Sequence, residues 1–112
     1  MDLDIPATLR HPLIHQQRFL ATEFLFQLGE IPTPIRIRCY REAGDGRVTC
    51  EQSHYLQTPL QAEPSFEGSD DHASVETALK AITDELVEQY QRAEQAGHRP
   101  GDAWLLPSRD FD

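Results

Sequence analysis

Apolar and polar residues alternate along residues 35–56, on both sides of a glycine-rich turn at 44–46. Alternation with a period of two around such a turn predicts a β-hairpin. We expect one face to be buried, with the members Ile35, Ile37, Cys39, Val48, Cys50, His54 and Leu56. The opposite face carries Arg36, Arg38, Tyr40, Thr49, Glu51, Ser53 and Tyr55.

The register of this hairpin stays open at the level of sequence. A two-residue loop at 45–46 pairs Cys39 with Gln52, whereas a four-residue loop at 43–46 pairs Cys39 with Cys50. Both registers keep the apolar residues on one face, so the pattern does not choose between them.

Residues from about 72 to 96 carry apolar side chains at spacings of three and four, which is the pattern of a helix with one buried face. The residues on this stripe are Val75, Leu79, Ile82, Leu86, Tyr90 and Ala93. Gly97 follows the stripe and is a typical residue at a helix end. We therefore predict a long helix here.

The apolar segment at 13–28 lies between a proline and a glycine, the residues preferred at the start and just past the end of a helix. Leu13, Leu20, Phe24 and Leu28 fall on one helical stripe. We predict a helix over 13–28. A strand at Phe24–Leu28 is the alternative, because a run of phenylalanine and leucine also suits a sheet.

These elements predict one small α+β domain over residues 1–112, in the order helix, antiparallel hairpin, long helix. Residues 1–11 have no periodic pattern and are interpreted as a loose N-terminal arm. Residues 97–112 are expected to form an extended aromatic tail. Because Trp104 makes this tail too apolar to stay in water, we expect it to pack back on the domain.

The chain has 19 acidic and 10 basic residues and a net charge of −9. A chain this acidic is repelled by phosphate backbones, so we expect no direct nucleic-acid binding. No apolar run approaches the roughly 20 residues that a membrane helix needs, and the first residues do not resemble a secretory signal. The sequence therefore predicts a cytoplasmic protein, away from the membrane, with reduced cysteines.

The His and Cys residues do not form a familiar catalytic or metal-binding pattern. A proline lies between His11 and His15, and no third and fourth ligand follows at a zinc-site spacing. Cys50 and His54 would lie about 13 Å apart on one strand, too far for a nucleophile and its base. We predict no catalytic residue, no cofactor and no metal ligand, and interpret Cys39 and Cys50 as small buried side chains.

The polar face of the hairpin is the remaining candidate site, because arginine and tyrosine recur at protein-binding hot spots. The partner-binding candidates are Arg36, Arg38, Tyr40, Glu51 and Tyr55. The alternative is an ordinary solvated face with Arg38 and Glu51 in cross-strand charge pairing.

This face favours a non-enzymatic accessory or regulatory protein that acts by binding another protein. One alternative is an acidic inhibitor that mimics nucleic acid and occupies a basic nucleic-acid-binding protein. A weaker alternative is a small enzymatic or metal-binding domain that uses His and Cys. The identity of the partner stays open, and so does the oligomeric state, a homodimer included.

Overall fold

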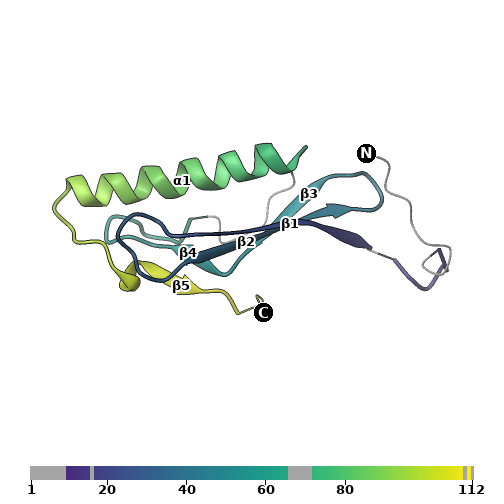
Figure 1. Ribbon diagram of the computed structural model, residues 1–112, viewed down its shortest axis with the longest axis horizontal. Helices are drawn as coiled ribbons and strands as arrows, with labels where there is room; N and C mark the ends of the chain where they lie inside the picture. Colours follow the sequence, from purple (N-terminus) through teal and green to yellow (C-terminus); the bar gives the residue numbers. More distant parts are fainter. Residues whose placement is uncertain (1–9, 16, 66–71, 110, 112) are drawn as a thin grey trace.

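The computed structural model describes residues 10–15, 17–65, 72–109 and 111. Its main sheet has three antiparallel strands in the order β1-β2-β3, with β1 at Arg18–Phe26, β2 at Ile35–Glu42 and β3 at Val48–Gln52. The molecule is elongated, with extents of 56 × 24 × 23 Å, and the sheet reaches beyond the helix at one end (Figure 1). The expected arm at 1–11 lies almost entirely outside the described residues.

The predicted hairpin is present as β2 and β3, in the register of the four-residue loop. Cys39 lies opposite Cys50, and Arg38 lies opposite Glu51. The loop is closed by two backbone hydrogen bonds, in which Glu42 N donates to Arg47 O and Gly46 N donates to Glu42 O. The turn hydrogen bonds thus choose the register that the alternation left open.

The prediction of a helix over 13–28 is wrong, because strand β1 occupies most of this segment. The register with β2 shifts between Leu20 and Thr22, at a bulge. As a result, Leu20 lies opposite Tyr40 and Phe24 lies opposite Ile37, on the two different faces of the sheet. An extra residue in a strand breaks its alternation, and the four-residue spacing of Leu20 and Phe24 then imitates a helical stripe. The alternative strand at Phe24–Leu28 overlaps only the end of β1.

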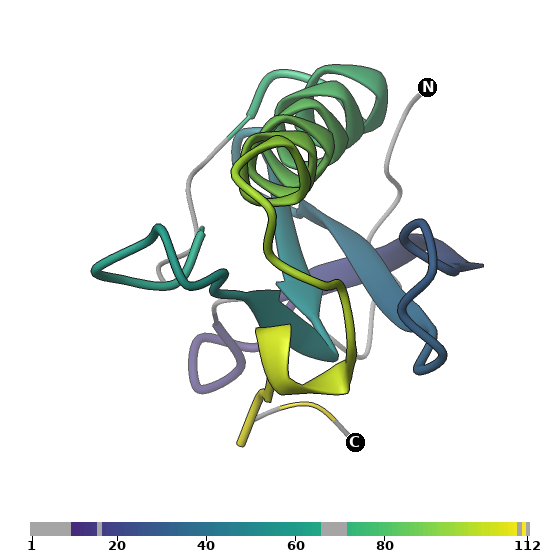
Figure 2. The ribbon, with the colours of Figure 1, turned by 90° about the vertical axis from the view of Figure 1, so that its left-hand side faces the viewer.

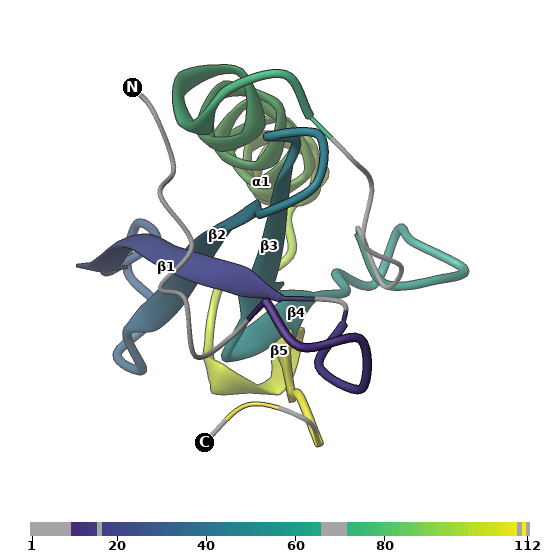
Figure 3. The same cartoon turned by 90° about the vertical axis from the view of Figure 1, so that its right-hand side faces the viewer.

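The predicted long helix is α1, Val75–Gln95. It begins at Ser74, whose side chain accepts a hydrogen bond from Thr77 N, the usual contact of an N-cap. The buried face of α1 consists of Ala78, Ile82, Leu86, Tyr90 and Ala93. Figure 3 shows α1 above β3, with β1 at the opposite edge of the sheet. No described helix is long and apolar enough to cross a membrane.

The C-terminal segment is not extended throughout, because a 3-10 helix, η2 at Asp102–Trp104, precedes strand β5 at Leu105–Pro107. Strand β5 pairs with β4, His54–Leu56, in a second, two-stranded sheet, which lies below α1 in Figures 1 and 2. The Trp104 side chain is 5% exposed and meets the Tyr90 ring edge to face, with 5.6 Å between the ring centroids. An aromatic pair of this geometry joins the C-terminal segment to α1.

The hydrophobic core lies between the sheets and α1. Its buried members are Leu28, Ile31, Ile35, Ile37, Cys39, Val48, Leu56, Ala78, Ile82, Leu86, Tyr90, Ala93, Trp104 and Leu105. Five of the seven residues predicted for the buried face of the hairpin lie in this core, and Cys50 packs against it as a partly buried side chain. Gln52 is also buried on this face, and its side-chain oxygen Oε1 has no hydrogen-bond partner among the described residues.

Candidate functional site

The face of the three-stranded sheet away from α1, which we call the outer face, gathers residues from all three strands. Directly opposite residues of an antiparallel ladder share a face. The register therefore places these side chains together: Leu20, Glu23 and Leu25 of β1, Arg36, Arg38 and Tyr40 of β2, and Thr49 and Glu51 of β3. Four of the five predicted partner-binding residues lie in this group.

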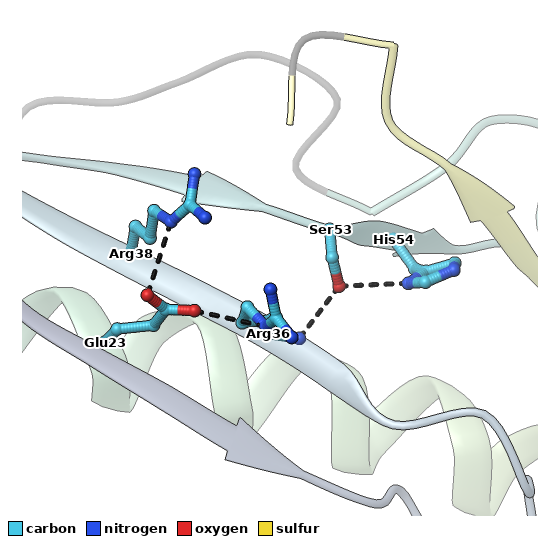
Figure 4. Close-up of polar contacts among 5 residues, drawn as sticks. All are labelled: Glu23, Arg36, Arg38, Ser53 and His54. Atoms are coloured by element: carbon cyan, nitrogen blue, oxygen red, sulfur yellow. Dashed lines mark hydrogen bonds and ion pairs between the residues drawn. The ribbon is translucent and has the colours of Figure 1, made fainter. Parts of the chain in front are cut away.

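One carboxylate on the outer face binds two guanidinium groups (Figure 4). Glu23 Oε1 lies 3.1 Å from Arg36 Nε, and Glu23 Oε2 lies 3.4 Å from Arg38 Nε. The Arg38 guanidinium also lies over the ring of Phe111, 4.1 Å from its centroid. Glu23 therefore links the two arginines of β2 on the outer face.

A second group on the outer face is built around Arg18. Its guanidinium lies 3.8 Å from the centroid of the Tyr40 ring, and its Nη2 lies 3.6 Å from Glu51 Oε2. Burial, followed by a hydrogen bond with Glu51 and the charge of Glu51, raises the pKa of the Tyr40 phenol above its ordinary value. Tyr40 is therefore a neutral hydrogen-bonding aromatic side chain at neutral pH.

An open pocket of about 280 Å³ lies beside Arg36, at the end of the outer face. It is lined by Leu25, Thr33, Pro34, Arg36, Ser53, His54 and Phe111. Ser53 Oγ accepts a 2.8 Å hydrogen bond from Arg36 N and lies 2.9 Å from His54 Nδ1 (Figure 4). The pocket thus combines a guanidinium and an imidazole with apolar walls.

The position of His54 differs from the prediction, which placed it on the buried face of the hairpin. The strand changes partner at Ser53, since Ser53 N donates to Arg36 O whereas Ser53 O accepts from Ser108 N. Because the ladder with β2 ends here, the alternation of faces does not continue to the next residues. His54 therefore lines the pocket next to Arg36.

The same break separates Tyr55 from the other predicted site residues. Tyr55 lies in β4, opposite Leu106 of β5, and therefore belongs to the two-stranded sheet. The prediction grouped Tyr55 with Arg36, Arg38 and Tyr40 because it assumed one uninterrupted alternation from 48 to 56.

Sequence reasoning missed the contributions of β1 and of the C-terminal segment, which supply Arg18, Glu23, Leu25 and Phe111. The first three were assigned to a predicted helix. The signal that could have found them is phenylalanine at every second position, Phe24 and Phe26, which suits a strand but is short and lies beyond the bulge.

Exposed apolar side chains concentrate on β1 and on the turn before it. Five of the eight exposed large apolar residues of the described chain are Leu13, Ile14, Leu20, Phe24 and Leu25. Leu25 is 62% exposed and Leu20 is 55% exposed. In the part of the chain that the structure describes, β1 pairs with β2 alone, so one edge of this nine-residue strand is open.

Within the described residues, no group of three or more His, Cys, Asp or Glu side chains could hold a metal ion. The two free thiols, Cys39 and Cys50, face each other on the core side of the sheet, with their sulfur atoms 3.3 Å apart. Comparison with protein-family models, with curated proteins and with solved structures finds no match for this chain.

Proposed function

We propose that this chain is a non-enzymatic accessory or regulatory protein that binds another protein through the outer face and the adjoining open edge of β1. The observation that carries the proposal is the concentration of exposed leucine and phenylalanine on this edge strand, beside Arg36 and Arg38. Exposed apolar residues that lie together mark interaction sites, whereas scattered ones are normal on a protein surface.

The open edge of β1 supports binding to an extended segment of the partner. An edge strand presents unpaired N–H and C=O groups, and an extended peptide can add to it as a further strand. Such a strand would run beside Leu20 and Leu25 on the outer face and beside Phe24 on the other face. It would remove these side chains from water.

The exposed guanidinium of Arg36 favours a partner segment that carries carboxylate as well as apolar side chains. Arg36 borders both Glu23 and the pocket, and its side chain is 45% exposed. An exposed arginine next to the apolar walls of Leu25, Pro34 and Phe111 can receive an acidic side chain while its neighbours bury apolar surface.

The test compares proteins retained from a native lysate by the immobilised wild-type chain with those retained by Leu25→Asp and Arg36→Ala. Val87→Asp is the matched control, because Val87 is another exposed apolar residue, 44% exposed, but lies on α1. We expect one set of proteins to bind the wild type and the Val87 variant and to be lost from the other two. Circular dichroism verifies that every variant is folded.

Equal retention by all four chains would overturn the proposal. If the bound proteins are retained equally by Leu25→Asp but are lost when salt is added, the result would favour the acidic mimic of nucleic acid. At physiological ionic strength, salt screens interactions between charges separated by more than about 8–10 Å. A second copy of this chain is one candidate partner, and sedimentation of the purified wild type and of Leu25→Asp measures self-association directly.

A further inference from the structure

Two thiols that the proposed function does not use lie in contact across the hairpin. Cys39 of β2 is directly opposite Cys50 of β3, and the Cys50 Sγ–H donates a hydrogen bond to Cys39 Sγ over 3.3 Å. Cys39 is fully buried, whereas Cys50 is half-buried. The pair therefore has one inner and one more accessible sulfur.

The kind of strand pair decides whether two facing cysteines can be bonded. Ser53 N donates to Arg36 O, and Glu42 N donates to Arg47 O, so the pairs 36–53 and 42–47 are hydrogen-bonded pairs. Hydrogen-bonded and non-hydrogen-bonded pairs alternate along an antiparallel ladder. The pair 39–50 is three positions from each of these two pairs, and it is therefore a non-hydrogen-bonded pair.

This placement suits a disulfide. In a non-hydrogen-bonded pair the two Cα atoms are about 4.5 Å apart and the side chains are close. A disulfide needs a Cα separation of about 4.4–6.8 Å. The sulfur atoms, now 3.3 Å apart, need to approach by only about 1.3 Å to reach bonding distance.

We propose that Cys39 and Cys50 form a reversible cross-strand disulfide by exchange with a low-molecular-weight disulfide such as glutathione disulfide. The Cys50 sulfur attacks one sulfur of glutathione disulfide while its proton passes along the hydrogen bond to the Cys39 thiolate, and one glutathione thiolate leaves. Cys39 then loses this proton to water and attacks Cys50 Sγ, which expels the second glutathione thiolate. Two protein thiols are oxidised, and one glutathione disulfide is reduced to two thiols.

The electrostatics of the pair support these roles. The hydrogen bond from Cys50 lowers the pKa of the Cys39 thiol, whereas the same bond raises the pKa of Cys50. Cys39 therefore loses its proton more readily than it would without the hydrogen bond from Cys50. Cys39 can act as the base in the first step and as the attacking thiolate in the second.

The test incubates the folded full-length chain with glutathione disulfide, blocks the remaining thiols and measures the mass. We expect the main product to be lighter than the reduced chain by two hydrogen atoms and to carry no glutathione. Reducing agent should restore the original mass. Because the bond closes a ring from residue 39 to residue 50, the oxidised chain should also unfold at higher urea concentration than the reduced chain.

Two single variants test the separate roles of the thiols. Cys39→Ser keeps the more accessible sulfur but loses the proposed base, so it should react more slowly than the wild type and stop at one bound glutathione. Cys50→Ser keeps the buried sulfur and should stay unmodified. The double variant Thr49→Cys with Cys50→Ser moves the second thiol to the opposite face of the hairpin. It should form no internal disulfide while folded. Circular dichroism verifies the fold of each variant.

Accumulation of a stable glutathione adduct on the wild type would overturn the proposal. Equally fast internal oxidation of the wild type and of the Thr49→Cys, Cys50→Ser double variant would also overturn it, because the register would then have no influence. The proposal does not depend on the binding function, since these assays measure only mass and stability.

Discussion

Replacing Gly29 by alanine should strongly destabilise the fold, because the structure leaves no room for a side chain at this position. A β-carbon on Gly29 would lie 2.3 Å from both Cζ and Oη of Tyr90, far inside van der Waals contact. Gly29 also has a φ of +53°, in the left-handed region that other residues rarely adopt. Gly29 therefore lets the chain after β1 lie against the ring of Tyr90.

The expected loss of stability has three contributions. The left-handed backbone costs alanine roughly 1–2 kcal/mol. Displacement of the Tyr90 ring breaks the 2.9 Å hydrogen bond from Glu30 N to Tyr90 Oη, worth about 1 kcal/mol net. It also disturbs the edge-to-face contact between Tyr90 and Trp104, worth about 0.5–1.5 kcal/mol. We expect Gly29→Ala to lower the free energy of unfolding by about 2.5–4.5 kcal/mol.

The assay is urea unfolding at 25 °C, followed by circular dichroism and by the fluorescence of Trp104. Gly97→Ala is the first control, because Gly97 has a φ of +92° but open space around its Cβ position, and it should lose only the backbone contribution. Gly44→Ala is the second control, because Gly44 has neither a positive φ nor a neighbour within 4 Å, and it should change stability by less than about 0.5 kcal/mol. A loss for Gly29→Ala no larger than that for Gly97→Ala would refute the steric argument.

Four further substitutions test the assignment of buried and exposed positions, each by urea unfolding. Ile37→Asp places an unpaired charge in the core and should prevent folding, whereas Arg38→Ala on the outer face should lower the free energy of unfolding by less than about 1 kcal/mol. Equal losses for the two variants would contradict the assignment of Ile37 to the buried face and of Arg38 to the outer face. Trp104→Ala should cost about 3–5 kcal/mol, and a loss below about 1 kcal/mol would contradict its packing in the core. Gln52→Met removes a buried amide oxygen that has no partner in the described part of the chain, so the variant should be as stable as the wild type or more stable; a large loss would indicate a hydrogen bond to that oxygen.

The elements predicted correctly from the sequence are those whose pattern is local and unbroken. The alternation of Ile35, Ile37 and Cys39 with polar residues placed one face of β2 in the core, and all three side chains are fully buried. The three-and-four spacing between Val75 and Ala93 likewise located α1. In both elements each turn or pleat repeats the same contrast between apolar and polar residues, so the backbone period can be recognised without knowledge of the neighbours.

Features that depend on a partner strand could be identified only in the folded protein. The bulge between Leu20 and Thr22 exists only in the pairing with β2, and it converts an apparent helical stripe into the two faces of β1. The hairpin register depended on hydrogen bonds across the loop, since both registers bury the same residues.

The candidate binding site also depended on contacts between distant segments. Glu23 of β1 holds Arg36 and Arg38, and Phe111 from the C-terminal segment covers Arg38. The change of partner strand at Ser53 moves Tyr55 into another sheet. A periodic pattern specifies which side of its own element a residue occupies, but pairing between strands specifies which residues meet. The sequence therefore located the arginine-bearing strand of the site, and only the tertiary structure could complete it.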